Sequence, residues 1–147
     1  MIYLAADHGG FEYKNKLKEI LEDSDYEFKD VGNHQLDKTD DYPDFTVKAV
    51  QGVLENPEKN RAVLFCRNGV GVSMTANKFK GIRATLSWSV KHAKSSRKDD
   101  NTNVLAIPAD YISFKKAQKI VKVWLETNFS DKERHNRRLD KIKSLGQ

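Results

Sequence analysis

Cys66 is the only cysteine of this 147-residue chain, and it stands where an apolar run meets a glycine-rich turn. The run over 62–65, Ala-Val-Leu-Phe, is typical of a buried strand. The residues that follow predict a turn that opens a helix: Arg67, Asn68, Gly69, Val70, Gly71, Val72 and Ser73. Such a turn aims backbone N–H groups and the positive end of a helix dipole at a bound anion, and both favour a thiolate. The pattern predicts a base or nucleophile for a small anionic substrate, although a lone cysteine is more often a small buried apolar residue.

Four other polar segments carry groups that can do chemistry: Asp7-His8-Gly9-Gly10, Asp40-Asp41-Tyr42-Pro43, Asp99-Asp100-Asn101-Thr102-Asn103 and Arg134-His135-Asn136-Arg137-Arg138. Each also has an ordinary structural reading, because Asp, Asn and Gly form caps and turns and a basic helix face is usually solvated. In the functional reading, Tyr42 forms an aromatic wall for a ligand and Asp99 holds or exchanges a proton. Arg134 and Arg138 are four residues apart on one helix face, where two guanidinium groups suit a phosphate.

The elements that position these residues alternate between strands and helices. Strands are expected over 2–5, 26–31, 62–66, 82–86 and 104–107. Helices are expected over 11–21, from Pro43 through 53, and over 70–78, 90–97, 114–125 and 131–145. This alternation indicates an α/β fold with a five-stranded parallel sheet covered by helices on both faces. Ligands of such sheets bind beyond the carboxyl ends of the strands, where Asp7, His8 and Cys66 are expected.

Composition narrows the class of protein. The length suits a single domain over 1–147, and one cysteine leaves no intrachain disulfide and no cysteine-rich zinc site. The net charge of +5 comes from lysines spread along the chain rather than from a patch, which disfavours a nucleic-acid-binding protein. Neither a dinucleotide fingerprint nor a Walker loop is present, so no nucleotide cofactor is indicated. We expect neither a signal peptide nor a membrane-spanning segment, and therefore a cytoplasmic protein with no membrane partner.

Taken together, these segments resemble one family over nearly the whole chain. The matching residues are Ala6-Asp7-His8-Gly9-Gly10, Asp41-Tyr42-Pro43, Cys66 with Gly69-Val70-Gly71 and Ser73, Ala76-Asn77-Lys78, Gly81-Ile82-Arg83, Asn103-Val104-Leu105, and Arg134-His135 with Arg138. In order and spacing they resemble the type B ribose-5-phosphate isomerases, a family that also holds the galactose-6-phosphate isomerase subunits.

The resemblance implies a Rossmann-like three-layer sandwich in a homodimer, or in a tetramer made of two such dimers, with active sites and the C-terminal helix at the subunit interface. It implies interconversion of aldose and ketose phosphates without a metal or organic cofactor. By this resemblance Cys66 is the base that moves a proton between C1 and C2 through an enediol(ate), and backbone N–H groups over 69–73 stabilise the oxyanion. His8, Arg134 and Arg138 hold the phosphate, some of them from the second subunit, and Asp7 and Tyr42 line the sugar.

Several positions depart from the family pattern. The family usually has glycine at Arg67 and a hydroxyl residue at Asn68, which can donate a hydrogen bond but cannot relay a proton. Asp99 stands where the family has its ring-opening histidine, and Asp100 replaces an asparagine. Asp110 stands where many members carry an arginine for phosphate. The expected site therefore comprises Cys66, Asn68 and Asp99 for catalysis, with Asp7, His8, Tyr42, Arg67, Gly69, Val70, Gly71, Ser73, Asp100, Arg134 and Arg138 around the substrate.

Three hypotheses about function follow. The first is a cofactor-free isomerase for ribose 5-phosphate and ribulose 5-phosphate. The second is an isomerase for another sugar, such as galactose or allose 6-phosphate or an unphosphorylated pentose, because the departures at Arg67, Asn68, Asp99 and Asp110 alter the pocket. The third is a non-catalytic sugar-phosphate or nucleic-acid binding protein on the same fold. It ranks last because Cys66 and the glycines of its turn are present.

Overall fold

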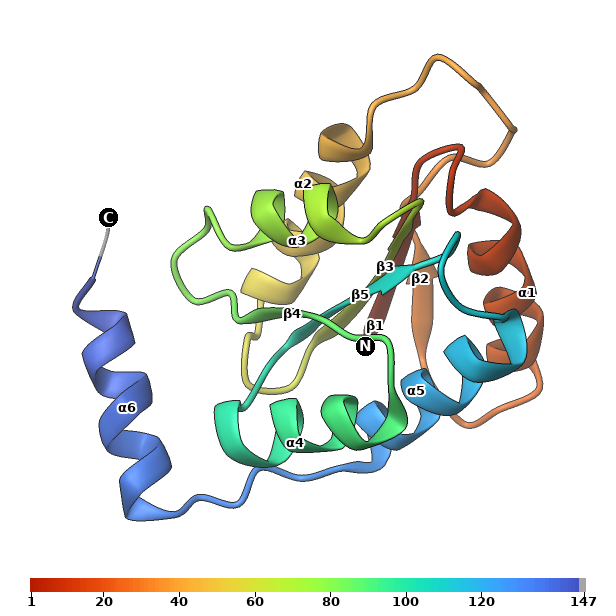
Figure 1. Cartoon of the computed structure of the whole chain (residues 1–147). Helices are drawn as coiled ribbons and strands as arrows, with labels where there is room; N and C mark the ends of the chain where they lie inside the picture. Colours follow the sequence, from red (N-terminus) through yellow and green to blue (C-terminus); the bar gives the residue numbers. More distant parts are fainter. Residues whose placement is uncertain (146–147) are drawn as a thin grey trace.

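A computed structural model describes residues 1–145 and shows a parallel sheet between two layers of helices (Figure 1). The five strands are β1 (Ile2–Ala6), β2 (Phe28–Asp30), β3 (Arg61–Cys66), β4 (Ala84–Leu86) and β5 (Val104–Pro108). The helices described are α1 (Phe11–Glu22), α2 (Tyr42–Leu54), α3 (Val70–Ala76), α4 (Val90–Asp100), α5 (Phe114–Glu126) and α6 (Glu133–Lys143). The predicted alternation of strands and helices is confirmed.

The strands are hydrogen-bonded in the order β2-β1-β3-β5-β4, and every pairing is parallel. The long central strand β3 pairs with β1 from Ile2 opposite Arg61, and with β5 through Cys66 opposite Pro108. All carboxyl ends of the strands therefore lie along one edge of the sheet, which we call the carboxyl edge. The opposite edge, where the strands begin, is the amino edge.

Side chains along each strand point alternately to the two faces of the sheet, so the core consists of two layers. Val63 and Phe65 of β3 pack with residues of α1, α4 and α5, including the fully buried Trp124. Leu64 and Cys66 pack with α2 and α3 on the other face. The helices α2 and α3 lie on one side of the sheet in Figure 1 and α4 and α5 on the other. Because successive side chains of a strand point to opposite faces, Cys66 is placed on the α2 and α3 face by its position in the strand.

Two differences from the predicted elements affect the site. The helix after the glycine turn ends at Ala76 rather than 78, so its dipole is that of about two turns. The helix expected over 90–97 continues to Asp100 and ends in Asn101, which has a left-handed φ of 47°. Asp99 and Asp100 were predicted in a polar loop before the fifth strand, and this is wrong because they form the last turn of α4.

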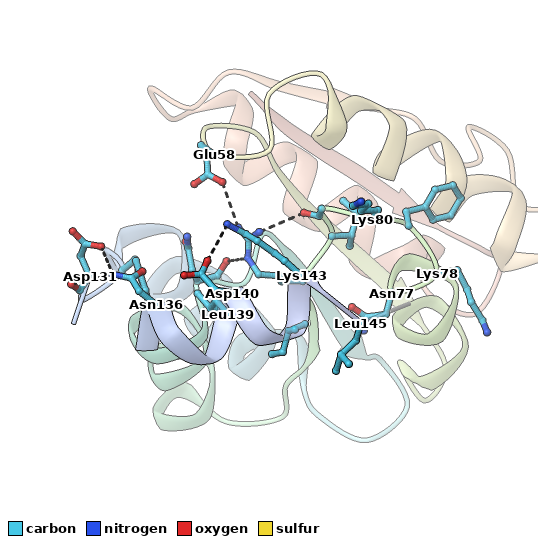
Figure 2. Close-up of a pocket in the computed structure, with 17 residues that line it drawn as sticks. Glu58, Asn77, Lys78, Lys80, Asp131, Asn136, Leu139, Asp140, Lys143 and Leu145 are labelled. Carbon is cyan, nitrogen blue, oxygen red and sulfur yellow. Dashed lines mark hydrogen bonds and ion pairs between the residues drawn. The ribbon is translucent and has the colours of Figure 1, made fainter. Parts of the chain in front are cut away.

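The helix α6 contacts α4 and stands at the side of the sheet near the short edge strand β4 (Figure 1). Between α6 and the segment 77–83 lies a cavity of about 440 Å³, and Figure 2 shows residues of both segments around it. Its apolar lining includes Leu139, Ile142 and Leu145, of which the last two are 56% and 74% exposed. None of the helices over residues 1–145 has the length and apolar character that crossing a membrane requires.

Candidate active site

Cys66 ends β3 at the carboxyl edge and is buried, with 4% of the residue exposed. The backbone N–H of Gly69 donates a hydrogen bond to its sulfur at 3.1 Å. Gly69 makes this turn with a φ of 73°, a left-handed conformation that favours glycine. The side-chain oxygen of Asn68 accepts from the backbone N–H of Val70 at 3.0 Å and lies 3.9 Å from the sulfur, within reach of the thiol proton. The turn therefore faces the sulfur itself.

The electrostatics of Cys66 differ from the prediction that the turn favours a thiolate. Burial raises the pKa of the Cys66 thiol, and the nearby Asp7 carboxylate raises it further. Backbone hydrogen bonds from Val72, Gly69 and Asn68 lower the pKa, but they do not outweigh burial. In the isolated chain the thiol form is favoured, so the expectation of a stabilised thiolate is wrong for this state. A ligand or a second chain that brings positive charge would change this balance.

Arg67 points away from the thiol and toward solvent. Its guanidinium pairs with Asp110 at 3.3 Å, and the two side chains are 65% and 46% exposed. The base of the Arg67 side chain crosses the loop after β1, since a Cβ added to Gly9 would lie 2.5 Å from its Cγ. The charge of Arg67 therefore neutralises Asp110 at the rim of the site, and it does not act on Cys66.

Tyr42 lies against the turn, as expected for an aromatic wall. It is the first residue of α2, and a Cβ added to Gly71 would lie 2.4 Å from the tip of its ring. Glycine at position 71 is therefore what allows this close approach. Val70 is 43% exposed and Ser73 is partly buried on the same short helix, so both border the turn.

Asp7 and His8 follow β1 at the same carboxyl edge. One oxygen of Asp7 accepts hydrogen bonds from the backbone N–H groups of Gly9 and Gly10, at 3.0 and 3.2 Å. Burial raises the pKa of the Asp7 carboxyl, although His8 and these two hydrogen bonds oppose the shift. His8 binds through its backbone N–H and its ring Nδ1 to one oxygen of Asp40, at 2.9 and 2.7 Å.

Sequence reasoning missed Asp40 as a site residue, although it noticed the loop that holds it. Asp40 lies 32 residues from His8 in the sequence. The available signal was topological: loops after the neighbouring strands β1 and β2 leave the sheet at the same edge. Asp7, His8 and Asp40 also offer ligand atoms within 4.8 Å of one another, the spacing of a metal site. Their contacting atoms already serve as partners in the hydrogen bonds above, so the cluster is satisfied without an ion.

The remaining predicted residues lie at the amino edge. Asp99 and Asp100 end α4 just before β5, which begins at Val104 opposite Ala62 near the start of β3. A strand of the length of β3 spans about 17–20 Å, and this length separates the two edges. Within one chain, Asp99 therefore does not lie beside Cys66, so a role for Asp99 in holding or exchanging a proton there would need a second copy of the chain.

Arg134 and Arg138 are exposed on α6, and a buried histidine connects the first of them to α4. The Nε–H of Arg134 donates to Nε2 of His135 at 3.1 Å. The other ring nitrogen, Nδ1, lies 2.8 Å from the hydroxyl of Ser130 and 3.8 Å from the Asp99 carboxylate. Asp99, His135 and Arg134 thus form one connected group, which presents an exposed guanidinium at the amino edge.

The sequence model of one protein family, described as Ribose/Galactose Isomerase, matches residues 2–142. The chain belongs to this family. A curated relative from Mycoplasma genitalium, named "Probable ribose-5-phosphate isomerase B", is 40% identical over 141 residues, which are 96% of this chain and 92% of the relative.

Solved structures of this isomerase family show the same fold. The crystal structure of ribose-5-phosphate isomerase B from Mycoplasma genitalium with bound ribulose-5-phosphate matches with a TM-score of 0.93 and 39% identity, covering 97% of this chain and 93% of that one. The ribose 5-phosphate isomerase from Thermotoga maritima matches with a TM-score of 0.92 and 37% identity, over 98% and 97% of the two chains. The isomerase fold expected from the sequence is therefore confirmed.

Proposed function

We propose that this chain is an aldose–ketose isomerase that interconverts ribose 5-phosphate and ribulose 5-phosphate with Cys66 as the base. The observation that carries the proposal is the Cys66 sulfur at the carboxyl edge, 3.1 Å from the backbone N–H of a glycine turn. Similarity over 97% of the chain to an isomerase that holds ribulose-5-phosphate supports the choice of substrate. The reaction uses only protein groups and requires neither a metal nor an organic cofactor.

The chemistry follows from the positions of the thiol and the turn. The Cys66 thiolate removes the proton from C2 of the open-chain aldose, and the electrons of that bond form a C1=C2 double bond. The oxygen on C1 becomes an oxyanion, which backbone N–H groups over 69–73 stabilise. The proton on the C2 oxygen passes to the C1 oxygen, and the thiol returns its proton to C1, which gives the ketose. Asn68 contributes a hydrogen bond at the turn, and Asp7 and Tyr42 border the sugar.

We further propose that a complete active site needs two copies of the chain in a homodimer. Cys66, His8 and Tyr42 lie at the carboxyl edge, whereas Arg134 and Arg138 are exposed near the amino edge. A single copy therefore offers a thiol without the guanidinium groups that suit a phosphate. A partner placed with its amino edge against this carboxyl edge supplies Asp99, Asp100, Arg134 and Arg138, with α6 at the interface.

Mixing two inactive variants tests the shared site. Cys66→Ala lacks the base and Arg134→Ala lacks the phosphate contact, so each homodimer is inactive. In an equal mixture, half of the dimers carry one intact site of two, and we expect about a quarter of wild-type activity after subunit exchange. If mass spectrometry verifies subunit exchange and the activity stays at the level of the single variants, the proposal of a shared site is wrong.

Proton NMR with ribose 5-phosphate in deuterated buffer tests the reaction itself. We expect ribulose 5-phosphate to form, with deuterium entering the sugar in the presence of the wild type but not of Cys66→Ser. Serine has nearly the shape of cysteine, but its hydroxyl does not ionise near neutral pH. Full activity of Cys66→Ser would show that Cys66 is not the base. Binding of ribose 5-phosphate without any exchange would indicate a non-catalytic binding protein.

The ion pair between Arg67 and Asp110 motivates a second candidate substrate, because it changes the charge at the rim of the site. Testing galactose 6-phosphate, allose 6-phosphate and unphosphorylated pentoses in the same NMR assay distinguishes these candidate substrates from ribose 5-phosphate. Exclusive turnover of ribose 5-phosphate would exclude the other sugars.

The single unpaired thiol suits a reducing compartment, and we infer that the enzyme works in the cytoplasm.

A further inference from the structure

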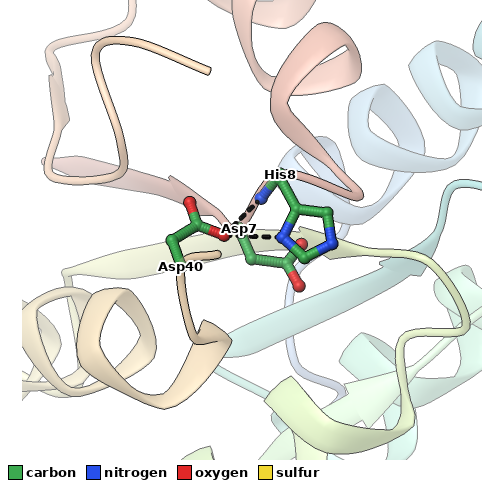
Figure 3. Close-up of side chains that lie close together, drawn as sticks. All are labelled: Asp7, His8 and Asp40. Atoms are coloured by element: carbon green, nitrogen blue, oxygen red, sulfur yellow. Dashed lines mark hydrogen bonds and ion pairs between the residues drawn. The ribbon is translucent and has the colours of Figure 1, made fainter. Parts of the chain in front are cut away.

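The guanidinium of Arg134 is held by a buried histidine. Its Nε–H donates to Nε2 of His135 at 3.1 Å, and only 4% of His135 is exposed. The other ring nitrogen, Nδ1, lies 2.8 Å from the hydroxyl of Ser130 and 3.8 Å from a carboxylate oxygen of Asp99. His8 also contacts a carboxylate (Figure 3), but its side chain is 24% exposed. Both ring nitrogens of His135 are engaged inside the chain, so this histidine is placed to hold another side chain rather than a ligand.

These contacts fix the proton of His135 on Nδ1. A guanidinium has only donors, so Nε2 has to accept from Arg134 with its lone pair. In the neutral ring the proton is then on Nδ1, where the Ser130 hydroxyl accepts it, and the negative charge of Asp99 favours the same arrangement. The backbone N–H of Ser130 donates to the carbonyl of Lys98 at 2.9 Å. The acceptor for Arg134 is therefore tied to the end of α4 as well as to its own helix.

The contact with His135 also determines which edge of the Arg134 guanidinium is free. A guanidinium can meet a phosphate with Nε and one terminal nitrogen, or with its two terminal nitrogens, Nη1 and Nη2. His135 already occupies the Nε–H. Within residues 1–145 no hydrogen bond or ion pair engages Nη1 or Nη2, and Arg134 is exposed. The two terminal nitrogens therefore remain as a pair for an anion.

The other two arginines of α6 are not held in this way. Arg137 pairs with Glu133 one turn earlier, at 3.1 Å on the exposed surface. Arg138 is exposed, and within the described part of the chain no hydrogen bond or ion pair engages its side chain. A free arginine side chain loses rotamer freedom when it binds an anion, whereas Arg134 has already lost much of it. Arg134 is therefore the more preorganised of the two predicted phosphate contacts, and its preorganisation depends on His135.

We propose that His135 is a positioning residue that orients Arg134 for the phosphate of the substrate, an inference that rests on the proposed function and its shared site. The histidine touches no reacting atom. It acts through Arg134, which presents Nη1 and Nη2 to two phosphate oxygens in the site of the partner copy. Loss of the acceptor on His135 should therefore weaken binding of the phosphate and leave the proton transfer at Cys66 intact.

The test measures binding of ribose 5-phosphate by calorimetry in the full-length Cys66→Ala protein, which lacks the proposed base and so does not consume the sugar. In that background His135→Leu should raise the dissociation constant about tenfold, because leucine fills the space without an acceptor for Arg134. His135→Gln places an amide oxygen near the position of Nε2 and should recover most of the loss. With Cys66 present, His135→Leu should raise KM about tenfold and change kcat by less than about threefold.

A double-mutant cycle separates this contact from a displacement of α6. If His135 acts through Arg134, adding His135→Leu to Arg134→Ala changes the dissociation constant by less than about twofold. Arg138 is the matched control, since it lies on the same helix and no hydrogen bond joins it to His135. Adding His135→Leu to Arg138→Ala should still weaken binding about tenfold.

The positioning role is wrong if His135→Leu binds as tightly as its parent, if His135→Gln is as weak as His135→Leu, or if the cycle gives the same result with both arginines. Ribose, which lacks the phosphate, is the control ligand. If the Cys66→Ala protein binds ribose 5-phosphate no better than ribose, phosphate recognition fails and the inference fails with it. If the wild type binds ribose 5-phosphate but does not convert it, the proposed function fails, while the cycle still decides whether His135 positions Arg134.

Discussion

The buried thiol of Cys66 predicts that activity depends strongly on pH. An ordinary cysteine has a pKa of about 8.5, so about 3% of it is thiolate at pH 7. Burial and Asp7 raise the pKa of Cys66, which leaves a smaller fraction ionised in the free chain. If the Cys66 thiolate is the base, as we propose, kcat/KM should rise about tenfold for each pH unit until the pH reaches that pKa. A raised pKa moves this rise to higher pH, not lower.

The thiol can be titrated directly because the chain has one cysteine. Ultraviolet absorbance of the thiolate, or the rate of alkylation by iodoacetamide, followed against pH gives the pKa without substrate. Asp7→Asn keeps an oxygen for the N–H groups of Gly9 and Gly10 but removes the charge. We expect it to lower the pKa of Cys66 by less than about one unit, because burial is the larger cause of the shift.

Asp37→Asn is the matched control, since Asp37 is exposed and is not among the groups that shift Cys66. It should leave the thiol pKa unchanged. A thiol pKa below about 7 in the substrate-free protein would refute the reasoning, because the turn, or positive charge from a second chain, would then outweigh burial and Asp7. A kcat/KM that is flat between pH 6 and 8 would show that the base is ionised throughout, which is inconsistent with a buried thiol.

Two pairs of substitutions test backbone strain at glycine turns and a buried ion pair, and chemical denaturation measures their effect on stability. Gly69→Ala should lower the free energy of unfolding by about 1–3 kcal/mol, because φ is 73° and the new Cβ would lie 2.4 Å from a leucine methyl carbon. Gly81→Ala, with a φ of 91° but a nearest contact of 3.3 Å, should cost less, and an equal cost would contradict the steric argument. Lys14→Met should cost about 3–5 kcal/mol because it leaves Asp30 buried without its ion-pair partner. Combining it with Asp30→Asn should recover part of the loss, and no recovery would show that the cost is steric.

The fold was predictable because its signals are local. Apolar runs such as 62–66 and 104–107 are short and bounded by turns, and their alternation with amphipathic segments leaves few topologies. Element ends were less predictable. The helix α4 continues through Lys98, Asp99 and Asp100, which look like loop residues in the sequence. Asn101 ends it by adopting a left-handed conformation, and no neighbouring residue type announces that position.

The site was predictable where its residues follow a strand directly and not where they meet across loops. Cys66 and the glycine turn are contiguous, so their geometry follows from the local sequence. The contact between Asp40 and His8 depends on how the loop 31–41 folds back, which no periodicity encodes. The sequence also did not predict which way the Arg67 side chain points. A long charged side chain at a turn pairs with an opposite charge that the fold brings close. That partner is Asp110, which is 43 residues away.

The pairing of Arg67 with Asp110 changes how the departures from the family pattern should be interpreted. Taken singly, a carboxylate at position 110 would repel a phosphate, and an arginine at position 67 would add a positive charge next to Cys66 in the sequence. Together they neutralise one another at 3.3 Å, and Asp110 also donates its backbone N–H to the carbonyl of Arg67 at 2.9 Å. The pair is exposed, so it adds little stability, but it cancels charge at the mouth of the site. In the homodimer that we propose, phosphate recognition would then depend on the guanidinium groups of α6 from the second copy of the chain.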